Sequence, residues 1–69
     1  MRYAVVIEKV KDNCSAYVPD LPGCVATGRT VEEIKERVGK AVELHLRGMR
    51  EDGLPIPEPM SLAEYVGAA

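Results

Sequence analysis

Cys24 and His45 are the residues best suited to covalent chemistry. A catalytic cysteine needs a nearby general base and a lowered pKa. Cys24 opens a short predicted strand that runs into the helix containing His45, the only histidine in the chain. A thiol enzyme that uses this pair is one hypothesis, which we rank last. A buried, unreactive cysteine is the simpler interpretation, because a free thiol packs well in a core and His45 falls on the apolar stripe of its helix.

Metal and acid–base chemistry are poorly supported by the spacing of the remaining residues. The two cysteines and His45 lie ten or more residues apart, unlike the closely paired ligands of zinc sites. Glu32 and Glu33 stand at the start of the predicted helix, where acidic side chains favour the helix N-terminus. Glu51 and Asp52 stand at its exit. We therefore expect no catalytic residues, no metal site and no cofactor.

The composition indicates one small domain that binds protein rather than nucleic acid. The chain has 69 residues and a net charge of −2. A chain of this size buries only about 60% of its unfolded surface, and oligomerisation is a common remedy. Nucleic-acid affinity comes largely from clustered Lys and Arg, whereas an acidic protein suits a basic partner. Nucleic-acid binding is therefore not expected without an added DNA-binding domain.

The sequence also predicts a cytoplasmic protein without a membrane contact. Charged residues follow the first apolar run directly, unlike in a signal peptide. No apolar run approaches the roughly 20 residues of a membrane span. Two cysteines do not make a disulfide framework, so we expect reduced thiols.

Three short strands are predicted in the first part of the chain. They cover residues 2–10, 14–20 and 24–28. The sequence "KDN" at 11–13 predicts the first turn, because Asp and Asn tolerate left-handed backbone. Pro22 and Gly23 predict a type II turn, in which proline presets its own φ and glycine accepts a positive φ. Short turns between consecutive strands predict one antiparallel sheet.

A long amphipathic helix is predicted over residues 29–53. Thr30 is a suitable N-cap with Glu33 three positions later, which together predict a capping box, and Gly53 suits the position after the helix end. Apolar spacing of three and four residues predicts one buried stripe. Gly39 and Gly48 each cost about 1 kcal/mol in a helix relative to alanine, and a close approach of another backbone would explain them.

The end of the chain predicts an edge strand and a short helix. Prolines alternate at 55, 57 and 59, a pattern that an edge strand over 54–60 tolerates. Ser61 and Glu64 predict a second capping box, hence a short helix or tail over 61–69 after a domain at 1–60. The predicted order is β-β-β-α-β plus the short helix. This is an α+β fold with one amphipathic helix on one face of the sheet, and apolar residues on the other face predict a protein contact.

With these elements in place, the sequence resembles the HicB family of antitoxins in its short HicB-like form. The resemblance lies in "YAVVIEK" (3–9), "SAYVPDLPGCVATG" (15–28), "TVEEI" (30–34) and "AVELHLRGMREDGLPIPEP" (41–59). It implies three antiparallel strands, a helix and a further strand, likened to a partial ribonuclease H fold. It implies no catalysis, but binding to a small, basic, RNA-cleaving HicA-type toxin whose active site is masked. Many family members continue into a C-terminal DNA-binding domain, whereas this sequence stops at Ala69.

We therefore expect a non-enzymatic antitoxin-like protein that forms a homodimer or higher homo-oligomer and binds a HicA-like toxin. Steric occlusion and charge complementarity would neutralise the toxin. The predicted contact residues are Tyr17, Asp20, Leu21, Glu51 and Asp52. Asp20 and Leu21 lie in a rigid turn, which presents side chains at little entropic cost. The alternative is a self-associating protein with a structural or regulatory role and no toxin partner.

Overall fold

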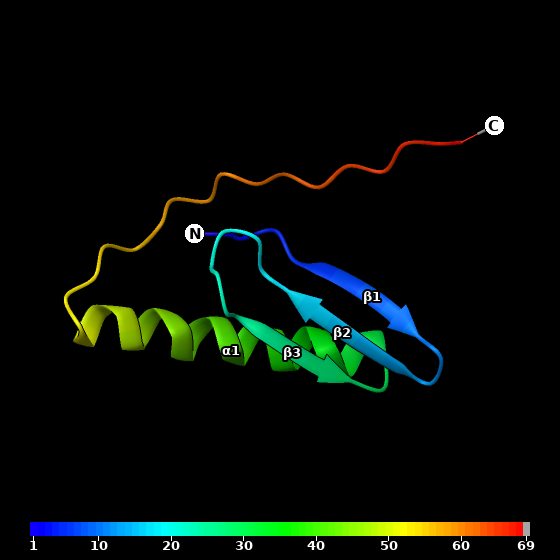
Figure 1. The fold of residues 1–69 in the computed structure, drawn as a ribbon, viewed down its shortest axis with the longest axis horizontal. Coiled ribbons are helices and arrows are strands. Elements are labelled where there is room, and N and C mark those ends of the chain that lie inside the picture. The colour runs from blue at the N-terminus through cyan, green and yellow to red at the C-terminus, as the bar shows by residue number, and fades with distance from the viewer. Residues whose placement is uncertain (69) are drawn as a thin grey trace.

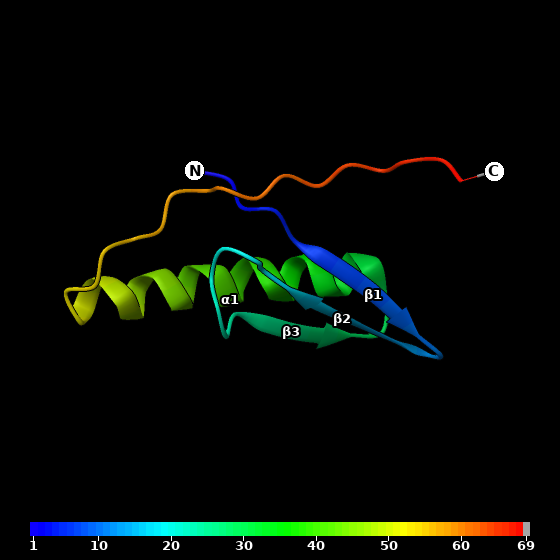
Figure 2. The same ribbon diagram turned by 45° about the horizontal axis from the view of Figure 1, so that its top comes forward.

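The computed structural model describes residues 1–68 and contains three strands followed by one helix (Figure 1). The elements are β1 (Val6–Val10), β2 (Asn13–Tyr17), β3 (Val25–Gly28) and α1 (Val31–Glu51). The strands form one antiparallel sheet in the order β1-β2-β3. The helix lies along one face of this sheet (Figure 2). The predicted α+β class, with an antiparallel sheet and one helix, is confirmed.

The core lies between β2, the following loop and α1. Alternate residues of a strand point to the same face, and on β2 these are Cys14 and Ala16, both buried. From the helix, Ile34 and Val38 pack against them. Partly buried side chains extend this cluster toward the start of the chain; they include Tyr3, Val5 and Ile7. The alternate residues of β2, Ser15 and Tyr17, point to the opposite face of the sheet.

The turn between β1 and β2 is tighter than the sequence predicted. Val10 pairs with Asn13, so that only Lys11 and Asp12 form the turn. Lys11 takes the left-handed conformation, with φ 51°, instead of the Asp or Asn residue expected there. The pairing register, rather than local preference, places the strain on Lys11.

Residues 18–24 form two consecutive turns that close one end of the core. The Val18 carbonyl accepts the Leu21 N–H at 3.0 Å, and the Leu21 carbonyl accepts the Cys24 N–H at 3.0 Å. Gly23 has φ 85° directly after Pro22, as the predicted type II turn requires. Val18, Leu21 and Cys24 are all buried, so this loop belongs to the core as much as the strands do.

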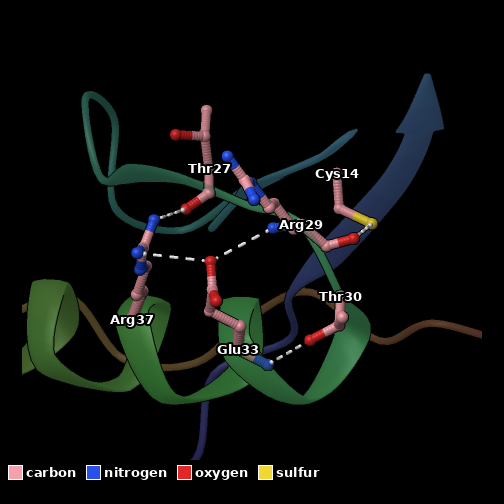
Figure 3. A network of polar contacts seen from close by, with 6 residues as sticks. All are labelled: Cys14, Thr27, Arg29, Thr30, Glu33 and Arg37. Atoms are coloured by element: carbon pink, nitrogen blue, oxygen red, sulfur yellow. Dashed lines mark hydrogen bonds and ion pairs between the residues drawn. The ribbon is translucent and has the colours of Figure 1, made fainter. Parts of the chain in front are cut away.

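A polar network joins the end of β3 to the first turns of α1 (Figure 3). The Thr30 hydroxyl accepts the Glu33 N–H at 3.0 Å, which confirms the predicted N-cap. Oε1 of Glu33 accepts the Arg29 N–H at 3.2 Å and lies 3.2 Å from a guanidinium nitrogen of Arg37. Arg37 also donates to the Thr27 carbonyl at 3.0 Å. The Glu33 carboxylate therefore binds the backbone of Arg29, the residue before the N-cap, and so holds the junction between β3 and α1 in place.

Glycines at the junction and in the helix have opposite surroundings. A Cβ on Gly28 would lie 3.2 Å from the Ile34 backbone nitrogen, whereas nothing lies within 4 Å of a Cβ on Gly39 or Gly48. The close approach proposed for the two helical glycines is therefore wrong within this chain. At the helix end, Gly53 has φ 70° and its N–H donates to the Arg50 carbonyl at 3.1 Å, as predicted for the residue after the C-cap.

The edge strand predicted over 54–60 is not formed. Three alternating prolines leave few N–H donors for a ladder. The segment is attached instead by single hydrogen bonds, such as that from the Tyr3 hydroxyl to the Pro57 carbonyl at 2.6 Å. Alternation of prolines is compatible with a strand but does not supply a neighbour to pair with.

The short helix predicted over 61–69 is also absent from its described part, residues 61–68, while residue 69 lies outside the described residues. The Ser61 hydroxyl that would cap such a helix donates to Asp20 at 2.9 Å instead. A helix of this length is only marginally stable by itself. The hydrogen bonds between Ser61 and Asp20 are therefore enough to favour the extended conformation. Residues 61–68 run as extended chain (Figure 1).

The junction between β3 and α1 gives the first testable prediction. Gly28→Ala is expected to lower the free energy of unfolding by about 1–3 kcal/mol, because overpacking forces backbone shifts. Gly48→Ala, the matched control in open space, is expected to raise it by about 0.5–1 kcal/mol. Urea denaturation measures both changes. If both substitutions changed the free energy of unfolding in the same direction, the close approach of Gly28 to the Ile34 backbone would be contradicted.

Candidate functional site

The face of the sheet opposite α1 carries one apolar row. Val6 pairs with Tyr17, and Tyr17 pairs with Val25, so the three side chains lie side by side across the sheet. Cys14 and Ala16 on β2 point the other way, into the core. Tyr17 is 42% exposed and Val25 64% exposed. We call Val6, Tyr17 and Val25 the open-face row.

A polar row lies next to the open-face row on the same side of the sheet. Glu8 pairs with Ser15, and Ser15 pairs with Thr27. An aromatic side chain that combines apolar area with a hydroxyl is enriched at protein interfaces. Tyr17 therefore has an apolar neighbour on each side across the sheet and a row of hydrogen-bonding groups next to it along the strands. This arrangement is suited to binding another protein.

The structure distributes the five predicted contact residues over three places. Tyr17 lies on the open face, whereas Asp20 and Leu21 lie in the 18–24 loop. Glu51 and Asp52 are exposed at the end of α1, on the other side of the sheet. Leu21 is fully buried, so its side chain packs in the core and offers no surface to a partner. The five residues do not form one surface.

The neighbours of Tyr17 on the open face were not singled out from the sequence. Val6 and Val25 lie far apart in the chain and meet Tyr17 only through the pairing register. The sequence signal that could have found them is the two-residue turn after β1 combined with the length of the 18–24 loop. Both must be known before the register can be written.

Asp20 attaches the 18–24 loop to the segment beyond the helix. One carboxylate oxygen, Oδ2, accepts the Met60 N–H at 3.0 Å and the Ser61 N–H at 2.9 Å. The other accepts the Ser61 hydroxyl at 2.9 Å. The Ser61 N–H is the main cause that holds the pKa of Asp20 below its ordinary value; desolvation opposes it, and the Ser61 hydroxyl and Met60 N–H add to it. The charge of Asp20 is therefore used within the chain.

Cys24 lacks the environment of a nucleophile. It is 3% exposed, and burial raises the pKa of its thiol, which favours the unreactive protonated form. Among the hydrogen bonds of residues 1–68, none joins Cys24 to His45. The geometry therefore supports a core cysteine.

Within 1–68, no three His, Cys, Asp or Glu side chains gather where they could hold a metal ion. In the part of the chain that the structure describes, α1 is too polar to cross a membrane and no other helix is present.

The family comparison matches nearly the whole chain. The model of the HicB_like antitoxin of bacterial toxin-antitoxin systems matches residues 3–69. A 14.9 kDa protein from the rep-hol intergenic region of Haemophilus phage HP1 (strain HP1c1) is 36% identical over 66 residues, which cover 96% of this chain and 50% of that protein. The chain thus spans half the length of this relative.

Shorter relatives and a solved structure agree with that match. A UPF0150 protein of Archaeoglobus fulgidus is 43% identical over 56 residues, which cover 77% of this chain and 81% of the relative. One from Helicobacter pylori is 41% identical over 49 residues, covering 71% and 68%. A chain in the solved HicA3 and HicB3 toxin-antitoxin complex has a TM-score of 0.73 and 28% identity, and the match covers 86% of this chain and 70% of that one.

The Asp20 contact gives a pH prediction. Because the folded state lowers the pKa of Asp20, the attachment should be complete at neutral pH and be lost as the pH falls through that lowered value. The Met60 and Ser61 amide resonances should move together in an acid titration followed by NMR. Asp20→Ala should give the low-pH positions at neutral pH, whereas Asp12→Ala in the exposed first turn should not. If the Met60 and Ser61 amide chemical shifts changed neither with acid nor with Asp20→Ala, the assigned hydrogen bonds to Asp20 would be contradicted.

The surroundings of Cys24 give a reactivity prediction. In a Cys14→Ser background, native Cys24 should react with iodoacetamide far more slowly at neutral pH than the same thiol in urea, because it is buried and protonated. Mass spectrometry measures the alkylated fraction over time. A native thiol that reacts faster than the unfolded one would restore the thiol-enzyme hypothesis.

Proposed function

The chain belongs to the HicB_like antitoxin family of bacterial toxin-antitoxin systems, and on that premise we propose that it neutralises a small, basic, mRNA-cleaving toxin of the HicA type. It acts in the cytoplasm as a binding protein and catalyses no reaction. The family match over residues 3–69 supports this role. So does the similarity to a chain in a solved HicA3 and HicB3 toxin-antitoxin complex.

The observation that carries the proposal is the uncovered open-face row. A helix on one face leaves Tyr17 and Val25 exposed on the other. Binding energy at protein interfaces concentrates in a few residues, with Tyr among the enriched types, when they lie near the centre of the contact. Tyr17 has this position, since Val6 and Val25 flank it across the sheet. We assign the toxin contact to this face.

Opposite charges speed the association of this chain with the toxin, and steric occlusion of the toxin's active site inhibits RNA cleavage. The chain carries a net charge of −2, and Glu8 lies exposed in the row beside Tyr17's row. Complementary charge raises the rate of association with a basic partner. A toxin that cleaves RNA must admit a polyanion to its active site, so a bound acidic protein over that site excludes the substrate by volume and by charge. No bond has to be made or broken by the antitoxin.

The contact surface is tested by removing the Tyr17 ring. Tyr17→Ala is expected to raise the dissociation constant for the small basic protein encoded next to this chain's gene by at least about tenfold, the effect of losing an interface hot spot. Leu44→Ala is the matched control, because Leu44 is 64% exposed on α1, away from the open face. It should change the constant by less than about twofold. Isothermal titration calorimetry measures both, and growth on co-expression reports neutralisation.

Two results would overturn different parts of the proposal. Unchanged toxicity on co-expression with the wild-type chain, together with no complex in solution, would end the antitoxin role. A tight complex that tolerates Tyr17→Ala but not Leu44→Ala would keep the role and move the contact to the helix.

A further inference from the structure

An apolar groove of about 520 Å³ lies between α1 and the start of the chain. It is lined by Met1, Tyr3, Val5, Ile7, Lys35, Val38, Gly39 and Val42. Because β1 is an outer strand of the sheet, its far edge has no neighbouring strand within the described chain. Unpaired edges with apolar surface beside them tend to recruit another segment of chain.

Gly39 leaves room in this groove that the chain itself does not use. It is an exposed helical position where an added Cβ would meet nothing within 4 Å. Glycine destabilises a helix interior by about 1 kcal/mol relative to alanine. No contact within residues 1–68 accounts for that cost. A segment that packs closely on the helix backbone at Gly39 would account for it.

Residues 60–68, which we call the extended segment, expose the apolar side chains that such a groove would take. Met60 and Leu62 are each 84% exposed, Tyr65 is 101% exposed and Val66 is 89% exposed. Figures 1 and 2 show the segment passing the first residues of the chain and then diverging from β1. None of its residues lines the groove. Ser61, Leu62 and Ala63 lie beside Arg2, Tyr3 and Ala4 at the rim, so within one copy the segment passes the groove without filling it.

We propose that the extended segment of one copy occupies the groove of a second copy, and the reverse, in a symmetric dimer. In an extended chain alternate side chains share a face, which places Leu62, Glu64 and Val66 together. The groove offers apolar walls and one cation, Lys35, that has no ion pair among the described residues. Glu64 complements Lys35, and its two neighbours on that face complement the apolar walls.

Reach and area are compatible with this exchange. At about 3.3 Å per residue, residues 62–68 extend roughly 23 Å beyond the attachment of Ser61 to Asp20. A symmetric dimer makes every contact twice, which helps two short segments to reach the buried area of about 1,000 Å² that a specific interface needs. The groove and the open-face row lie on different sides of the sheet, so the dimer is independent of toxin binding.

The first experiment is sedimentation equilibrium of the 69-residue chain alone. The wild type should be a dimer, and Leu62→Asp with Val66→Asp should be a folded monomer, since both side chains are more than four-fifths exposed within one copy. Leu44→Asp with Leu54→Asp is the matched control, because these leucines are 64% and 52% exposed outside the groove. It should remain dimeric. A monomeric wild type, or a dimer that survives the change in the extended segment, would overturn the proposal.

The second experiment tests the register of the groove. Gly39→Gln should dissociate the dimer by filling the groove, whereas Gly48→Gln, at the other open helical glycine, should not. Glu64→Lys and Lys35→Glu should each raise the dimer dissociation constant severalfold, and the double change should restore it. Failure of the double change to restore the dimer would contradict the pairing. A monomer that loses toxin binding on Gly39→Gln would assign the groove to the toxin instead.

Discussion

The structure depends on one constraint, which is that a single helix covers only one face of a three-stranded sheet. Residues 1–68 contain one helix, α1, and its buried side chains, Ile34 and Val38, meet the inward residues of β2. Among residues 1–68, no second helix or further strand covers the opposite face. The apolar side chains on that face therefore belong to the protein surface and not to the core. Their exposure follows from the small size of the domain, because a short chain buries a smaller fraction of its surface.

This constraint separates stability from recognition within the same strands. On β2, Cys14 and Ala16 pack against the helix, while Tyr17 is exposed on the other face, where we propose the toxin contact. The 18–24 loop contributes Leu21 and Cys24 to the core and uses Asp20 to hold residues 60 and 61. Two surfaces result, the open-face row and the groove beside β1. They lie on different sides of the sheet, so the proposed toxin contact and the proposed contact with a second copy do not overlap.

Sequence alone predicted those features that local chemistry decides. The Thr30 cap, the turn at Pro22 and Gly23 and the position of Gly53 each follow from backbone preference and short-range hydrogen bonds, and each is present. The alternation on β2 was also predictable, because a strand with one buried face repeats every second residue.

The features that failed depend on contacts between distant residues. Ser61 has the local pattern of a helix cap, but Asp20, forty-one residues earlier, binds its hydroxyl and its N–H. The prolines at 55, 57 and 59 suit an edge strand, but no strand pairs with them. Tyr17 could be named from the sequence, whereas its neighbours Val6 and Val25 required the register of both strand pairs. Leu21 was predicted to be an exposed turn residue, but its side chain is fully buried in the core.

The central claim is that the sheet face left free by α1 is the surface that binds a partner. An NMR titration of the isotopically labelled chain with its toxin tests this claim most directly. The account predicts that the resonances of Val6, Tyr17 and Val25 shift or broaden together, while those of the buried Ile34 and Val38 stay in place. Perturbations confined to α1 and the groove, with an unchanged open-face row, would contradict it.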